Sequence, residues 1–226
     1  MVCMVARECF LRCGAPRAVS VALYLHAFQL AVCVQQELGR PHREVFSTIS
    51  SEPIAAASLG QVYRATLASS GADVAVKVQR PGVLELVALD LVIGRKGVEI
   101  AGALFPDIKA DNIIPVLDEW AFKLYREMDY RRERDVMQQF AVDLSDLSGI
   151  VVPEAFSEAT TRRVLCTEWI QGEKLSESNA SDVRQLCTTL LNAYLIQLLD
   201  TGLLHAGTAP SSSRCITDLH VPASNP

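Results

Sequence analysis

Two short segments rich in β-branched residues, 62–67 and 74–79, are separated by the polar, glycine-containing connection 68–71. This pattern predicts an antiparallel hairpin. Successive side chains of a strand point to opposite faces, so Ala75 and Lys77 share one face and three valines share the other. The hairpin therefore places one lysine beside one small residue, opposite an apolar row.

That pairing of residue types suits a nucleotide cleft. A methyl-sized side chain at position 75 lets an adenine ring approach the strand, and the ammonium of Lys77 can reach phosphate oxygens. The alternative interpretation is an exposed lysine on a half-solvated strand.

A run of small residues precedes the first strand of the hairpin. A loop that covers phosphates needs side chains small enough for the backbone to approach, which glycine provides best and alanine less freely. An alanine-rich helical turn is the alternative. The candidate loop residues are Ala55, Ala56, Ala57, Ser58 and Gly60.

Residues 83–104 and 115–140 have the apolar spacing of two helices, with a break near position 106. In the second helix Glu127 falls on the same stripe as Trp120. A carboxylate on an apolar face needs a cation, so we expect it to pair with Lys77, while a local pair with Arg131 is equally compatible with the spacing. Asp129 would face away from the stripe in a continuous helix.

Residues 161–172 are typical of a strand that continues into an extended connector ending in glycine. The backbone of such a connector can bind the edge of an adenine ring, and Glu168, Trp169 and Ile170 are the candidates for this contact. A plain edge strand followed by a turn is the alternative. After it, residues 181–202 predict a long helix with a polar cap at its start and a glycine at its end.

Taken in order, these segments resemble the UbiB/ADCK family of atypical protein-kinase-like proteins, also called the ABC-one family. The resemblance covers residues 35–206, and its most specific pieces are the alanine-rich loop at 55–63 and Val-Ala-Val-Lys-Val-Gln-Arg-Pro at 74–81. The Glu-Met-Asp-Tyr sequence at 127–130 resembles the family's Glu-x-Asp motif, and 166–172 resembles its hinge.

The resemblance implies an α+β fold, a protein-kinase-like N-lobe with an antiparallel sheet and an enlarged helical insert at 83–140, followed by part of a helical C-lobe. It implies ATP as ligand, with Mg²⁺ expected for the family, and a role in prenylquinone or lipid metabolism within a chloroplast or mitochondrion. Lys77 would hold the phosphates, Glu127 would be its partner within the Glu-x-Asp motif that includes Asp129, and residues 168–170 would frame the adenine.

The chain departs from the family at its catalytic loop. The family continues His-Ala-Asp-Pro-His-Pro-Gly-Asn, whereas this chain has Gly207 where the catalytic aspartate is expected and no counterpart of the metal-binding residues. We therefore expect no intact catalytic residues and no metal ligands, and hence no phosphoryl transfer. The alternatives are a catalytically silent pseudokinase or interaction module, and a fragment of an active full-length kinase.

Composition excludes other function classes. The formal net charge of −5 excludes bulk nucleic-acid binding as a first interpretation. The seven cysteines include no CxxC pair and the four histidines are scattered, so the sequence predicts no metal cluster.

Three parts of the chain are expected: a segment at 1–34 that is first cationic and then apolar, a truncated kinase-like domain at 35–206, and a disordered tail at 207–226. The first is typical of organelle targeting or membrane association, and a packed amphipathic helix is the alternative.

Overall fold

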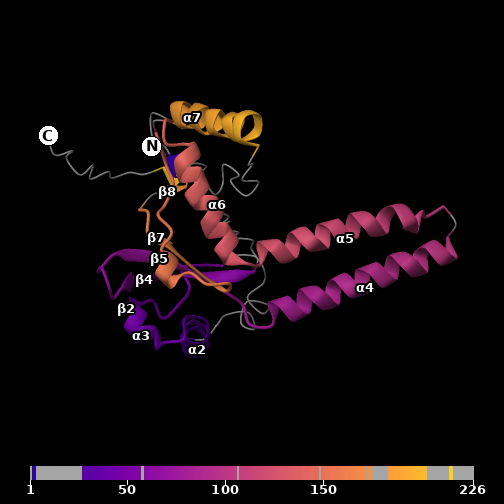
Figure 1. Cartoon of the computed structure of the whole chain (residues 1–226), viewed down its shortest axis with the longest axis horizontal. Helices are drawn as coiled ribbons and strands as arrows, with labels where there is room; N and C mark the ends of the chain where they lie inside the picture. The colour runs from indigo at the N-terminus through magenta and orange to yellow at the C-terminus, as the bar shows by residue number, and fades with distance from the viewer. Residues whose placement is uncertain are drawn as a thin grey trace.

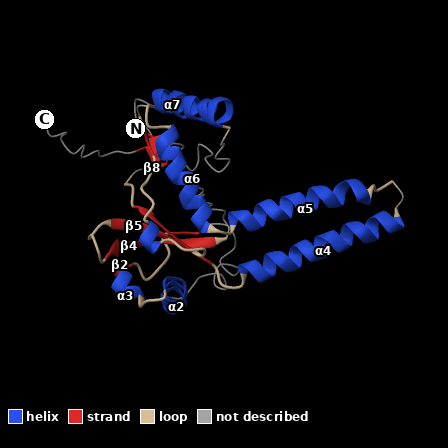
Figure 2. Ribbon diagram, in the orientation of Figure 1, coloured by secondary structure: helices blue, strands red, loops and turns tan. Residues whose placement is uncertain are grey.

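We describe a computed structural model of the chain over residues 2–3, 27–56, 59–105, 107–147, 149–171, 173–174, 183–202 and 214–215. Its centre is a five-stranded antiparallel sheet in the order β2-β4-β5-β7, with β3 also paired to β4 (Figure 2). The strands are β2 (Phe46–Ile49), β3 (Ala55–Ala56), β4 (Gly60–Leu67), β5 (Asp73–Gln79) and β7 (Val164–Glu168).

The predicted hairpin is formed by β4 and β5. Its register pairs Tyr63 with Val76, and β7 adds Cys166 opposite the same valine. Residues directly opposite one another share a face of an antiparallel sheet, so these three side chains lie together, and all are fully buried. This face is the main hydrophobic core, and a row of β-branched residues on β5 is the reason that it is apolar.

Two helices, α2 (Ala27–Leu38) and α3 (His42–Val45), contribute to this core. Val34 is completely buried and belongs to this core. Glu37 joins α2 to the start of β7: its carboxylate accepts hydrogen bonds from Arg163 Nε at 2.6 Å and from Thr161 Oγ1 at 2.8 Å. Burial raises the pKa of Glu37, but the bonds from Arg163 and Thr161 outweigh burial, and the pKa lies below its usual value.

The insert forms a long two-helix hairpin, made of α4 (Val83–Leu104) and α5 (Ala110–Glu127), that projects away from the sheet (Figure 1). The first predicted helix is confirmed. The two helices pack along each other and are joined by an ion pair between Arg95 and Asp118. Both are largely exposed, and neither contains a side chain that is fully buried.

The predicted single helix over 115–140 is wrong, because the chain breaks after α5 and resumes as α6 (Tyr130–Asp143). Asp129 has an extended backbone, and its side chain accepts a hydrogen bond from the backbone N–H of Arg131. This is an N-cap, and it satisfies a donor that the first turn of a helix cannot satisfy internally. The hydrophobic period is similar on both sides of the break, so spacing alone does not reveal it.

The C-terminal part of the described chain packs on the far end of α6. The helix α7 (Val183–Ile196) continues into a π-helical turn at Gln197–Thr201 and ends at Gly202, whose φ of 66° is left-handed, which supports the predicted glycine stop. Phe140 of α6 packs with Ala193 of α7. Thus α6 connects the sheet to the beginning of a helical lobe, as Figure 1 shows.

A second small sheet joins β1 (Val2–Cys3), β6 (Ile150–Val151), β8 (Glu173–Lys174) and β9 (Arg214–Cys215). Residues 4–26 of the predicted targeting segment lie outside the described residues. Of the predicted tail, only β9 is described, and it pairs with β1 and β8.

Candidate functional site

Lys77 is a buried cation on the face of the sheet opposite the main core. Its side chain is 8% exposed, and its Nζ donates hydrogen bonds of 2.9 Å to both carboxylate oxygens of Glu133, whose side chain is 17% exposed. The ammonium also lies 4.7 Å from the centre of the Tyr130 ring, a cation–π distance. Two charge-assisted bonds and an aromatic face therefore hold the lysine in one place.

The expected pairing of Lys77 with Glu127 is wrong in this structure. Glu127 is the last residue of α5 and is exposed, because the helix hairpin stands away from the sheet rather than packing on it. Trp120 on the same stripe is 55% exposed, so this stripe is not a core face. Arg131, the local partner considered for Glu127, instead binds Asp129 at 2.8 Å.

The partner of Lys77 comes from α6. Tyr130, Glu133 and Met137 are spaced i, i+3 and i+7, which places them on one helix face. Tyr130 and Met137 pack against Leu165 of β7, and this contact directs Glu133 to Lys77. The spacing that brings Glu133 to this face is visible in the sequence, but it is hidden when α5 and α6 are treated as one helix.

Lys77 lies between Val62 of β4 and Leu165 of β7, and the small residues Ala75 and Thr167 lie further along the same face of the sheet. The register pairs Ala75 with Arg64 on one side and with Thr167 on the other, so all three share the face of Lys77. The position of Ala75 is thus as the strand alternation predicts. Thr167 was not singled out from the sequence, although alternation along β7 places it on this face together with Leu165.

The alanine-rich loop lies at the edge of this face. Ala55 and Ala56 form β3 and pair with β4 in a tight antiparallel turn, while Ala57 and Ser58 lie outside the described residues. Gly60 has a packing role: a Cβ there would lie 2.6 Å from the carbonyl oxygen of Val78. The glycine is therefore needed for close approach of two strands, whatever else the loop contacts.

The connector after β7 is held by backbone bonds. The N–H of Glu168 donates to the carbonyl of Glu154 at 2.8 Å, and the N–H of Trp169 donates to the carbonyl of Asp73 at 3.0 Å. The Trp169 ring is stacked under the guanidinium of Arg64, at 5.2 Å from its centre. Both of these N–H groups are already used within the chain, which leaves Ile170 as the candidate backbone donor for an adenine edge.

Asp129 of the predicted Glu-x-Asp motif caps α6 and pairs with Arg131. The hydrogen bond from the Arg131 side chain lowers the pKa of the Asp129 carboxyl below its usual value. Burial opposes this shift, and the hydrogen bond from the backbone N–H of Arg131 adds to it. Among the described residues, no group of three or more His, Cys, Asp or Glu side chains is arranged to hold a metal ion.

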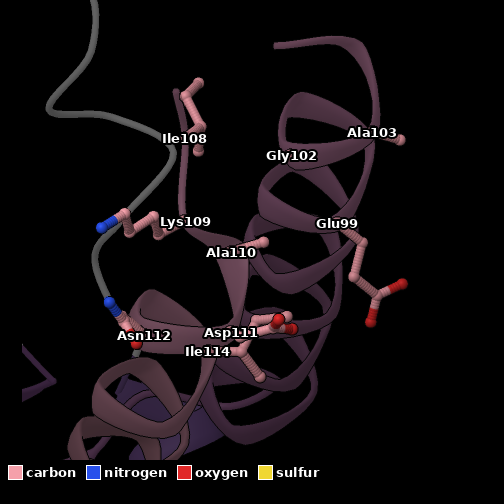
Figure 3. A pocket seen from close by; sticks show the side chains of 9 residues that line it. All are labelled: Glu99, Gly102, Ala103, Ile108, Lys109, Ala110, Asp111, Asn112 and Ile114. Atoms are coloured by element: carbon pink, nitrogen blue, oxygen red, sulfur yellow. The ribbon is translucent and has the colours of Figure 1, made fainter. Parts of the chain in front are cut away.

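A separate depression of about 520 Å³ lies at the tip of the helix hairpin, between the end of α4 and the start of α5 (Figure 3). Its charged lining residues include Lys109 and Asp111, and both are exposed. It is at the far end of the hairpin from the sheet, so it does not extend the Lys77 site.

Comparison with known proteins agrees with this geometry. The model of the ABC1 atypical kinase-like domain matches residues 21–212. The chain belongs to this family. The structure of Rv3197 from Mycobacterium tuberculosis in complex with erythromycin matches at a TM-score of 0.64 and 31% identity, over 76% of this chain and 44% of that one. The α+β, kinase-like N-lobe predicted from the sequence is thereby confirmed.

Curated relatives are much longer than this chain. The Arabidopsis thaliana protein named "ACTIVITY OF BC1 COMPLEX KINASE 3, chloroplastic" is 39% identical over 185 residues, which are 80% of this chain and 26% of the relative. The Synechocystis protein sll0005 is 36% identical over 190 residues, 82% of this chain and 28% of the relative. The chain thus spans about a quarter of the length of these relatives. In the part that the structure describes, none of the helices is both long and apolar enough to cross a bilayer.

Proposed function

We propose that the Lys77 face of the sheet binds the phosphates of ATP, with the adenine next to Ala75 and Thr167. The observation that carries the proposal is the buried Lys77–Glu133 pair, with two 2.9 Å bonds, on the face of the sheet that also holds the small residues Ala75 and Thr167. An ammonium that is already held in place loses little conformational freedom when a phosphate binds, which favours affinity.

We also propose that this chain binds nucleotide without transferring its phosphoryl group. Phosphoryl transfer needs metal ions and an acid that orients the nucleophile. The sequence has Gly207 at the position where the resemblance places the catalytic aspartate, and that residue lies outside the described part. Asp129 of the Glu-x-Asp motif is engaged as the N-cap of α6.

The test is a titration of the purified chain with a fluorescent ATP analogue, with and without Mg²⁺. Lys77→Met keeps an apolar stem but removes the charge, and we expect affinity to fall by about 1.5–3 kcal/mol, the range of a charge-assisted contact. Lys123→Met is the matched control, because Lys123 lies on α5 and its side chain is 66% exposed. Equal affinity of the two variants would refute the site.

A phosphate-release assay tests the second part. We expect no turnover above the buffer rate, and none after Gly207→Asp alone, because one carboxylate does not restore the metal ligands. Robust Mg²⁺-dependent hydrolysis that disappears in Lys77→Met would show that other groups replace the missing ones. Absence of any nucleotide binding would favour a silent interaction module.

We further propose an organellar role in prenylquinone or lipid metabolism. Support comes from the family membership and from the names of several Arabidopsis relatives, which are given as chloroplastic. Residues 1–34, with Arg7, Arg12 and Arg17 before an uncharged stretch, are the candidate targeting or membrane-associating segment. Fusion of this segment to a soluble reporter tests the proposal, and a purely cytosolic distribution would count against it.

A further inference from the structure

A bend at residues 161–163 comes directly before β7 and is hydrogen-bonded to three other elements. The first is the sheet, where the N–H of Gln79 donates to the carbonyl of Arg163 at 2.9 Å. Gln79 is the last residue of β5, is 3% exposed and follows Lys77 by two residues. This bond extends the ladder between β5 and β7 beyond their last strand pair, so the 161–163 bend fixes the end of the strand that carries Lys77.

The same bend binds the first residue of α6. The N–H of Tyr130 donates to the carbonyl of Arg162 at 3.0 Å. An N–H in the first turn of a helix has no acceptor within its own helix, so this external carbonyl satisfies it. Glu133 comes three residues later, on the same face of the helix. The bend therefore fixes the start of the helix that carries the acid as well as the end of the strand that carries the lysine.

The third contact of the bend is the carboxylate of Glu37, on α2. It accepts three hydrogen bonds, from Thr161 Oγ1 at 2.8 Å, from the backbone N–H of Arg163 at 3.2 Å and from Arg163 Nε at 2.6 Å. The Glu37 side chain is 15% exposed. Bonds to a shielded carboxylate are charge-assisted and directional, so these three hold the bend in one arrangement.

The attachment of α2 to the sheet has a different origin. Val34 is completely buried in the main core, and Cys33 and Leu38 of the same helix pack against this core. These apolar contacts hold the helix on the sheet, whereas the bonds of Glu37 described above all go to the 161–163 bend. The two contributions of α2 can therefore be removed separately.

We propose that Glu37 is a positioning residue for the nucleotide site: it fixes the 161–163 bend, and the bend sets the separation of β5 and α6 at which Lys77 pairs with Glu133. Glu37 needs no contact with the nucleotide, because α2 packs on the core face of the sheet and Lys77 lies on the other. The consequence for ATP rests on the proposed function. When the bend is loose, a phosphate has to order the lysine as it binds, and affinity falls.

Acylation of Lys77 tests the positioning without a nucleotide. The folded chain is treated briefly with N-hydroxysuccinimidyl acetate, and peptide mass spectrometry gives the rate at Lys77 relative to that at Lys123, which is 66% exposed. We expect Glu37→Gln to raise this relative rate at least about fivefold, because loss of a charge-assisted bond makes local opening of the pair more frequent.

The matched control is Val34→Ala, three residues before Glu37 on the same helix. It leaves a cavity in the main core and should lower the free energy of unfolding at least as much as Glu37→Gln, which urea unfolding verifies. It removes none of the bonds of the bend. The relative rate at Lys77 should therefore stay within about twofold of the native value.

Amide hydrogen exchange, followed by NMR, locates the effect. Glu37→Gln should speed exchange of the Gln79 and Tyr130 N–H groups, whose acceptors are carbonyls of the bend, more than exchange at the centre of the sheet. Thr161→Val removes one donor and no charge, so it tests the same contact if Glu37→Gln folds poorly. The double variant should be little worse than Glu37→Gln alone, because both changes act on one bend.

Titration with the fluorescent ATP analogue completes the test. We expect the dissociation constant to rise at least about threefold in Glu37→Gln and to stay near the native value in Val34→Ala. If the native chain binds no analogue, the proposed function fails, and acylation and exchange still decide whether Glu37 positions the pair.

Three results would overturn the inference. The first is equal acylation of Lys77 in the native chain and in Glu37→Gln. The second is an equal rise in Val34→Ala, because Glu37 would then only stabilise the fold. The third is equal affinity of the native chain and Glu37→Gln for the analogue under conditions where Lys77→Met binds weakly.

Discussion

Replacing Glu133 with glutamine should destabilise the fold and weaken nucleotide binding together. The side chain keeps its shape and one acceptor oxygen, but Lys77, which is 8% exposed, loses the charge that compensates its own. Removing one partner of a buried pair costs about 3–5 kcal/mol. Because the new amide still accepts one hydrogen bond and the Glu133 site is partly hydrated, we expect about 2 kcal/mol for Glu133→Gln and about 3 kcal/mol for Glu133→Ala.

A double-mutant cycle measures the interaction energy between Lys77 and Glu133 separately from the individual contribution of each residue. Lys77→Met with Glu133→Leu replaces both charges with apolar groups of similar volume, and the double variant should be less destabilised than Glu133→Ala alone. Urea unfolding followed by tryptophan fluorescence measures the free energies of unfolding, provided that the m-value is unchanged among variants. If Glu133→Gln changes the free energy of unfolding by less than about 0.5 kcal/mol, or if the double variant is as unstable as the sum of the single ones, the buried pair does not hold the site as argued.

Three other properties can be checked on the same protein. Gly60→Ala should destabilise the fold by about 1–3 kcal/mol, because the added Cβ would clash with the backbone of β5. Gly94→Ala should stabilise the fold by about 0.5–1 kcal/mol, because the added Cβ lies in open space and alanine favours a helix. Thermal or urea unfolding of the two variants compares their stabilities. Because the pKa of Glu37 is lowered in the folded state, its contribution to stability is present above the unfolded pKa and is lost as the pH falls through the folded pKa. The stability of Glu37→Gln should therefore decrease less in acid than that of the native chain. Urea unfolding at a series of pH values measures this difference. Burial raises the pKa of Cys166 to about 12, so in the native chain iodoacetamide at mildly alkaline pH should modify exposed Cys187 and spare Cys166, as peptide mass spectrometry can show.

Local patterns were enough to predict the strands β4, β5 and β7 and the helices α4 and α7, whereas β2 was not predicted and β3 was expected to be a loop. The β4–β5 hairpin follows from β-branched alternation around a polar turn, and α4 follows from its apolar spacing, because both signals arise within a few consecutive residues. The site was predicted in part: Lys77 and Ala75 share a face as alternation requires. The acidic partner of Lys77 depends on how α6 packs across β7, which is a contact between residues 56 positions apart.

The error over Glu127 has a specific physical source. The sequence shows that an acid lies on an apolar stripe, but it does not show whether that stripe is buried, and here it faces solvent on a projecting hairpin. The cap at Asp129 is a signal of the kind that sequence can reveal, because an aspartate that precedes a run of helix-forming residues commonly starts a helix. A helix that starts there has Glu133 in its first turns, on the same face as Tyr130.

The Arg64–Trp169 stack gives the chain an optical probe of its own. The chain has two tryptophans, and they differ in surroundings: Trp120 is on the projecting hairpin and 55% exposed, whereas Trp169 is partly buried in the connector beneath a guanidinium. A water-exposed indole emits at longer wavelength and is quenched readily by iodide, so the two signals can be resolved without labels. In a Trp120→Phe background, the remaining emission would report the state of the connector alone, and its response to a ligand would locate that ligand relative to β7.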